Sequence, residues 1–170
     1  ILNSPKIVTI AETDQKVILT EDKSNIAVRN KAVKLVFDKS DGILKELLIG
    51  QENIIHEGQG FVPNFWRAPI DNDFGNDLHK RCIDWRYTSK NRLLKNIDSK
   101  MENGSAVITV YYQLNKDSNE KMAEFSLKYT VYGDGRVLVK SSLKKTSQEL
   151  SETPRVGLRI VLSKELDQIS

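Results

Sequence analysis

The residues best suited to chemistry gather in one segment, residues 58–77, which follows no regular hydrophobic period. We single out a candidate substrate-proximal loop within it, consisting of Asn64, Phe65, Trp66, Arg67, Asp71, Asn72, Asp73, Gly75 and Asn76. Aromatic rings can stack on the face of a sugar, and carboxylates and amides can bind its hydroxyl groups. These residue types therefore favour carbohydrate recognition by the loop.

The same residues also allow a purely structural role. Arg67 is suited to a bidentate bond with Asp71 or Asp73, and Asn72 can satisfy turn amides. Pro63 and Pro69 fix the backbone and remove amide donors, which gives the loop a defined path outside a sheet interior. An arginine–aspartate clasp that orders the loop and a sugar-binding loop are both compatible with this pattern.

Other residue types that often carry chemistry are sparse. Cys82 is the only cysteine, so no intrachain disulfide or thiolate metal site can form, and we expect it to be a small buried residue. His56 and His79 have no cysteine or carboxylate at metal-ligand spacing, and we therefore assign no metal ligand. Trp85 is expected to pack in the core. We assign no catalytic residue to this chain.

The composition is that of an ordinary globular protein. The 170 residues are 39% hydrophobic and 29% charged, which is enough for one domain with a real core. The 26 basic and 23 acidic residues give a formal charge of +3 and are dispersed, whereas a nucleic-acid groove needs a concentrated basic stripe. No apolar run reaches the roughly 20 residues of a membrane span. We expect neither nucleic acid nor membrane as a partner.

The elements that must position the loop show a period of two. Residues 124–132 alternate apolar and polar side chains, and Gly133-Asp134-Gly135 then predicts a hairpin turn into residues 137–140. A second hairpin is predicted from residues 33–38 and 43–49 around Ser40-Asp41-Gly42. Further strands are predicted at residues 6–10, 17–20, 26–29, 105–114 and 155–162, and one short helix at about 78–87. This pattern predicts an all-β antiparallel sandwich.

The chain starts without methionine and stops just after a strand-like run. We therefore expect both ends to be cuts in a longer polypeptide. Residues 1–20 are expected to be a linker or tail from a preceding domain. Residues 21–170 are expected to form the β-sandwich, incomplete at its C-terminus.

Residues 64–75, Asn-Phe-Trp-Arg-Ala-Pro-Ile-Asp-Asn-Asp-Phe-Gly, closely resemble a motif of the small-chain, or fifth, domain of family 2 β-galactosidases. Thr153-Pro154-Arg155-Val156-Gly157-Leu158 resembles a strand of that family, and Glu165-Leu166-Asp167-Gln168 resembles the approach to its last conserved loop. The resemblance covers about residues 21–170. The stretch Trp85-Arg86-Tyr87-Thr88 departs from the family's tryptophan-containing helix.

The resemblance implies a super-sandwich similar to the galactose-mutarotase fold, lying against a (β/α)₈ barrel that carries both catalytic glutamates and the magnesium and sodium ligands. Those groups have no counterpart in this chain. It also implies that the Asp71–Asp77 loop approaches the active-site mouth and that Gly75 is hinge-like. The implied partners are the remaining domains, a galactoside and a second copy of the parent enzyme, which is expected to be a homo-oligomer in the bacterial cytoplasm or periplasm.

Three functions are consistent with these observations. The favoured one is an accessory domain that helps to complete the galactoside pocket of a multidomain hydrolase. The second is a free-standing carbohydrate-binding module with Phe65, Trp66 and Tyr87 as an exposed platform. The third is a sugar mutarotase, which requires a histidine and a carboxylate that converge in one pocket.

Overall fold

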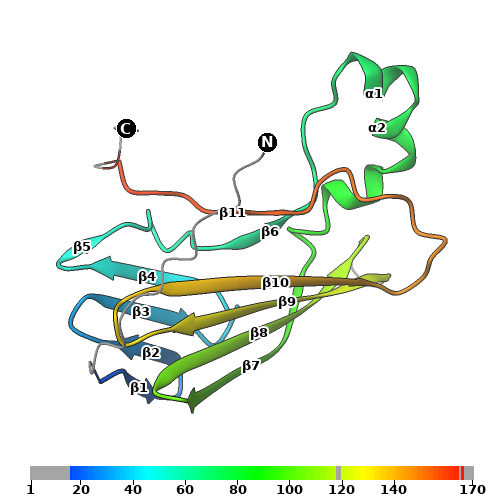
Figure 1. Cartoon of the computed structure of the whole chain (residues 1–170). Helices are drawn as coiled ribbons and strands as arrows, with labels where there is room; N and C mark the ends of the chain where they lie inside the picture. Colours follow the sequence, from blue (N-terminus) through cyan, green and yellow to red (C-terminus); the bar gives the residue numbers. More distant parts are fainter. Residues whose placement is uncertain (1–15, 118–119, 165, 167–170) are drawn as a thin grey trace, which may run out of the picture.

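Antiparallel strands dominate the computed structural model, which describes residues 16–117, 120–164 and 166. They form a five-stranded sheet, a four-stranded sheet and a two-stranded ribbon (Figure 1). The prediction of an all-β antiparallel sandwich is therefore confirmed. The strand predicted at residues 6–10 and the motif at residues 165–168, apart from Leu166, lie outside the described residues.

The first sheet has the strand order β1-β2-β3-β4-β5. Its strands are β1 (Ile18–Glu21), β2 (Asn25–Arg29), β3 (Val33–Asp38), β4 (Leu44–Ile49) and β5 (Glu52–Asn53). In β3, Val33, Leu35 and Phe37 are buried and the residues between them are partly exposed, as burial of one face requires. Because β1 pairs with β2, the sheet includes residues 18–20, which lie before the expected domain start at residue 21.

The predicted hairpin between β3 and β4 is confirmed, and its turn touches the second sheet. Gly42 has φ +71, and a Cβ atom there would lie 2.5 Å from Val110 Cγ1 and 2.8 Å from Leu94 Cδ1. The Tyr112 hydroxyl donates a hydrogen bond to the Asp41 carbonyl at 3.0 Å. Both the backbone angle and the close contact thus require glycine at this turn.

The second sheet has the strand order β10-β9-β8-β7. Its strands are β7 (Leu93–Glu102), β8 (Ser105–Asn115), β9 (Lys121–Val131) and β10 (Val137–Lys145). The predicted β9–β10 hairpin is confirmed, with Gly135 at φ +91 in its turn. Strand β7 was not predicted, because its pairing with β8 shifts register between Leu94 and Asn96 and this shift hides the period of two.

The inner faces of the two sheets pack together into one core. Phe37 of β3 meets Tyr129 of β9 edge-on, with ring centroids 4.8 Å apart. The same buried cluster includes Leu35, Val110 and Leu127. Burial of each such side chain stabilises the fold by about 1.5–3 kcal/mol, so the sandwich is a firm base for the segments attached to it.

The ribbon carries the candidate loop. It consists of β6 (Val62–Asn64) paired with β11 (Gly157–Arg159), so the strand predicted at residues 155–162 is shorter than expected, with one further bridge between Ile55 and Leu162. Between β6 and β7, residues 65–92 leave the sandwich as an excursion (Figure 1) that contains α1 (Asp71–Gly75), α2 (Leu78–Arg81) and the 3₁₀ helix η1 (Ile83–Arg86). The helix predicted at residues 78–87 is thus divided into α2 and η1, and α1 was not predicted.

Candidate functional site

The excursion begins with a buried anchor. Phe65 is only 1% exposed, and its ring meets Trp85 and Phe125 edge-on at centroid distances of 5.6 Å and 5.5 Å. Trp66 is partly buried and packs against the same core, while its backbone N–H donates to Asn64 Oδ1 at 3.3 Å. Trp85 is fully buried, as predicted. These aromatic residues fix the start of the excursion to the sandwich.

Arg67 and Asp73 form a clasp just beyond the anchor. Both terminal guanidinium nitrogens of Arg67 donate to the Asp73 carboxylate, Nη2 to Oδ1 at 2.8 Å. Asp73 is 5% exposed, and its Oδ2 also accepts a hydrogen bond from the Ile70 backbone N–H at 2.9 Å. The hydrogen bond from Arg67, followed by the one from Ile70, holds the pKa of Asp73 below its usual value. Of the two aspartates proposed as partners of Arg67, the structure selects Asp73.

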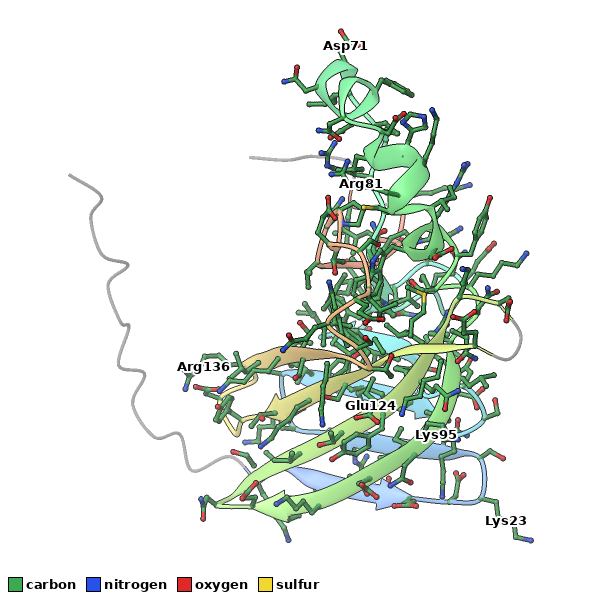
Figure 2. The ribbon with its side chains drawn as sticks, turned by 90° about the vertical axis from the view of Figure 1, so that its right-hand side faces the viewer. Lys23, Asp71, Arg81, Lys95, Glu124 and Arg136 are labelled. Atoms are coloured by element: carbon green, nitrogen blue, oxygen red, sulfur yellow. The ribbon has the colours of Figure 1, made fainter. Side chains whose placement is uncertain are left out.

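Beyond the clasp, residues 70–77 apart from the buried Asp73 form an exposed tip. Asp71 lies at its far end (Figure 2), and Asn72, Gly75 and Asn76 are exposed with it. Phe74, which we did not predict as a site residue, is 54% exposed, and its ring centroid lies 4.8 Å from that of His79. Carboxylate, amide and phenyl groups are thus presented together to solvent.

Gly75 does not use a backbone conformation that requires glycine. It lies in α1, and a Cβ atom added there would meet nothing within 4 Å. The residue of the tip with a left-handed backbone is Asp77, at φ +57. The physical reason given for a hinge at Gly75 is therefore absent from this conformation.

The return leg of the excursion is tied to the loop between β10 and β11. Arg81 donates to Glu152 through Nε at 2.9 Å and to Asn76 Oδ1 through Nη1 at 2.9 Å. The Trp85 indole N–H donates to the Ser151 carbonyl at 3.2 Å. Arg81 was not predicted, because its partner Glu152 is 71 positions away and no local pattern links them. These contacts join α2 and η1 to the loop between β10 and β11, and Arg81 also holds Asn76 of the tip.

The candidate loop thus separates into two structural parts. Asn64, Phe65, Trp66, Arg67 and Asp73 anchor it, while Asp71, Asn72, Gly75 and Asn76 are presented at the tip. The tip can bind hydroxyl groups and stack on an apolar face. Hydrogen bonds from Arg67 and from Lys80 lower the pKa of Asp73 and of Asp77, respectively, so neither carboxyl is protonated near neutral pH as a general acid must be.

In residues 16–117, 120–164 and 166, no three His, Cys, Asp or Glu side chains are grouped so that they could hold a metal ion. None of the helices in this part of the chain is long and apolar enough to cross a membrane.

Comparison with known proteins decides the family. The family model described as beta galactosidase small chain matches residues 29–170. The chain belongs to the β-galactosidase small-chain family. Relatives named beta-galactosidase include those of Priestia megaterium, 28% identical over 150 residues, and Lactococcus lactis, 26% identical over 171 residues. A third, from Clostridium acetobutylicum, is 27% identical over 158 residues.

This small-chain segment is much shorter than those relatives. The matches cover 88%, 94% and 93% of this chain, but only 14%, 16% and 17% of the respective β-galactosidases. The resemblance predicted from residues 64–75 is confirmed by the family match.

Proposed function

We propose that this chain is an accessory domain of a retaining β-galactosidase, and that its tip helps to shape the mouth of a galactoside pocket whose reactive groups come from another domain. The observation that carries the proposal is that the excursion is divided into a fixed base and an exposed tip, in a chain that belongs to the β-galactosidase small-chain family. A buried anchor and a clasp fix the base, while Asp71, Asn72 and Phe74 are exposed at the end. Such a loop can present groups to a neighbouring pocket at a defined place.

Hydrolysis of the glycosidic bond is assigned to the remaining domains for a related reason. Retaining hydrolysis needs a nucleophilic carboxylate and a carboxylic acid of raised pKa. The two tip-proximal carboxyls with shifted pKa values, Asp73 and Asp77, are both shifted downward. We therefore infer that the catalytic glutamates lie elsewhere in the parent protein, together with its magnesium and sodium ligands.

Exposed apolar side chains support a role in assembly. Ile70 is 57% exposed, Phe74 54% and Ile83 36%, and all three belong to the excursion rather than to the sandwich. Groups of exposed apolar residues commonly mark contact sites. We infer that the excursion packs against the neighbouring domain through some of these side chains, which positions the tip.

The two alternative functions have less support. Phe65 is buried, so it cannot form an exposed platform with Trp66 and Tyr87. For a mutarotase, His56 does lie near a carboxylate, with Nε2 3.6 Å from Glu57 Oε1, but the Glu57 side chain is 73% exposed. Such a solvent-exposed pair lacks the pocket that the reaction needs.

The test compares tip variants with a remote control in the complete hydrolase. Asp71→Asn combined with Asn72→Ala is expected to lower kcat/KM for lactose about fivefold to 150-fold, because two hydrogen bonds are lost and each contributes about 0.5–1.5 kcal/mol. Lys23→Gln, at the opposite end of the molecule (Figure 2), should leave it unchanged. The pure 170-residue chain should not hydrolyse lactose. An unaltered kcat/KM in the double variant, or turnover by the chain alone, would refute the proposal.

A further inference from the structure

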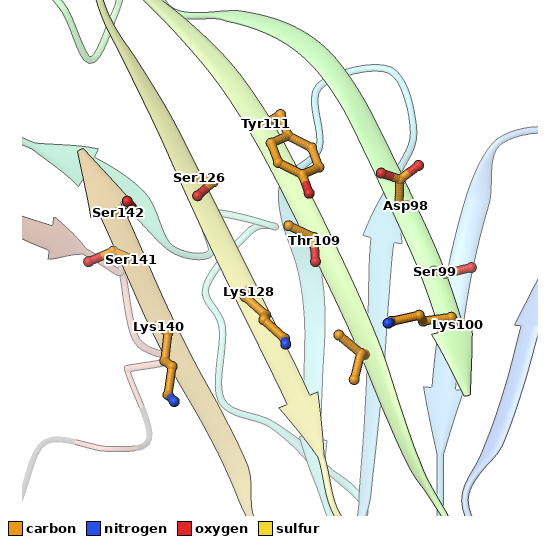
Figure 3. Close-up of a pocket in the computed structure, with 11 residues that line it drawn as sticks. Asp98, Ser99, Lys100, Thr109, Tyr111, Ser126, Lys128, Lys140, Ser141 and Ser142 are labelled. Carbon is orange, nitrogen blue, oxygen red and sulfur yellow. The ribbon is translucent and has the colours of Figure 1, made fainter. Parts of the chain in front are cut away.

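A hollow lined mostly by polar side chains lies on the outer face of the second sheet, away from the excursion. It is a trough of about 750 Å³, and side chains from all four strands β7–β10 line it (Figure 3). Cross-strand register places its central residues in two rows. One row is Thr109, Lys128 and Lys140, and the next is Tyr111, Ser126 and Ser142. Two residues along a strand separate the rows, which corresponds to about 7 Å.

The first row has an unusual concentration of positive charge. Lys128 and Lys140 are directly opposite each other on β9 and β10, an arrangement that destabilises a sheet. Lys100 on β7 extends its ammonium group towards that of Lys128 across β8 (Figure 3). Lys100 is paired with Glu102, but within the described residues no ion pair joins Lys128 or Lys140 to a carboxylate. An anion bound between these two lysines would relieve their repulsion.

Among the residues that line the trough, only one carboxylate lies in this row. Asp98 is the one acidic residue among those that line the trough, and it stands opposite Thr109, on the far side of β8 from Lys128. Its Oδ1 accepts a hydrogen bond from Asn96 Nδ2 at 2.9 Å. The trough lining contains three lysines against this single aspartate. An occupant that complements it must carry negative charge.

The second row adds groups that suit a sugar. Tyr111 is 42% exposed, so part of its ring is accessible to a sugar. Ser126 and Ser142 follow it across β9 and β10, and their hydroxyls both donate and accept hydrogen bonds, as sugar hydroxyls do. An ion alone would not use this row, whereas a sugar ring with a charged substituent would use both rows.

We propose that this trough binds an acidic saccharide, such as a uronic acid. Lys128 and Lys140 hold its carboxylate, Tyr111 stacks on its ring, and Ser126 and Ser142 bind its hydroxyl groups. The site is distinct from the tip, and it requires neither the neighbouring domain nor hydrolysis. Whether the tip has its proposed role therefore does not affect this inference.

The test titrates the 170-residue chain with digalacturonic acid, lactose and sodium sulfate at low ionic strength, using calorimetry and the amide NMR signals of β8–β10. Digalacturonic acid is expected to bind saturably and to shift signals of both rows. Lys128→Gln combined with Lys140→Gln should weaken binding at least tenfold, since two charge-assisted contacts are lost. Lys23→Gln is the matched control and should bind as the unaltered chain does.

Stability provides an independent readout that also verifies folding of the variant. In low salt, Lys140→Gln should raise the Tm because it removes the repulsion from Lys128, and digalacturonic acid should raise the Tm of the unaltered chain but not of the double variant. Equal affinity for lactose, equal affinity for sulfate, no binding of digalacturonic acid, or undiminished binding by the double variant would each overturn the proposal.

Discussion

The base and the tip of the excursion are neighbours in sequence but differ in almost every physical respect. Phe65 and Asp73 at the base are 1% and 5% exposed, whereas Ile70 and Phe74 at the tip are 57% and 54% exposed. The base has its polar groups paired by Arg67, while the tip turns Asp71 to solvent (Figure 2). A continuous motif can therefore combine residues that hold a loop with residues that the loop presents.

This contrast separates two kinds of loss of function. A change at the base should disorder the whole loop and lower stability, and it would reduce activity only as a consequence. A change at the tip should leave folding intact and act on substrate alone. Substitutions at matched pairs of residues, one in the base and one in the tip, should therefore separate the two kinds of loss.

Phe65→Ala should have the largest effect. The buried ring loses its contacts with Trp85 and Phe125 and leaves a cavity, so the free energy of unfolding should fall by about 3–5 kcal/mol. Phe74→Ala removes the same ring from the exposed tip and should change stability by no more than about 0.5 kcal/mol. Urea unfolding monitored by tryptophan fluorescence measures both. Similar losses in the two variants would abolish the distinction between base and tip.

Asp73→Asn should have the next largest effect on stability, and Asp71→Asn should have almost none. The Asp73 carboxylate accepts from Arg67 and Ile70 and has a lowered pKa, whereas Asp71 is exposed at the end of the tip. A carboxyl with a lowered folded-state pKa stabilises the fold above its unfolded pKa, about 4, and loses this contribution as the pH falls through the folded pKa.

The pH dependence of Tm is the decisive measurement for this pair. From neutral pH down to about 4, the Tm of Asp73→Asn should lie below that of the unaltered chain, and the difference should shrink below pH 4 as Asp73 becomes protonated. Asp71→Asn should follow the unaltered chain throughout. A difference that stayed constant down to pH 2 would show that the clasp acts through packing rather than through charge.

Sequence alone predicted the sandwich well, because the core strands show a local alternation of apolar and polar residues. The hairpins at Gly42 and Gly135 combine a clear period of two with a turn residue of positive φ. Strand β7 was missed because a register shift interrupts its alternation. The loop motif identified the family. It did not show that Asp73 rather than Asp71 is the partner of Arg67, because that pairing depends on the short helix α1, which no hydrophobic period predicted.

The exposed tip was the least predictable part for a related reason. Most of its side chains face solvent, and Arg81, which donates to Asn76 of the tip, is itself bonded to the distant Glu152. Neither feature leaves a local pattern. Burial was equally hard to predict from the sequence. Phe65 and Phe74 are the same residue type nine positions apart, yet one is buried and the other is exposed. Residue type indicated the chemistry available to the loop but not which side chains would be free to use it.

Gly75→Ala should have the smallest effect on stability, and it tests whether Gly75 acts as a hinge. Since Gly75 is helical and a Cβ atom there has open space, alanine should raise the free energy of unfolding by about 0.4–1 kcal/mol. Gly42→Ala is the contrasting variant and should destabilise by more than that, because φ is positive there and the added Cβ atom would clash with Val110. In the complete hydrolase, a stabilised Gly75→Ala variant with lower kcat would mean that the tip must bend at this position during turnover, whereas an unchanged kcat would assign the loop a single fixed conformation.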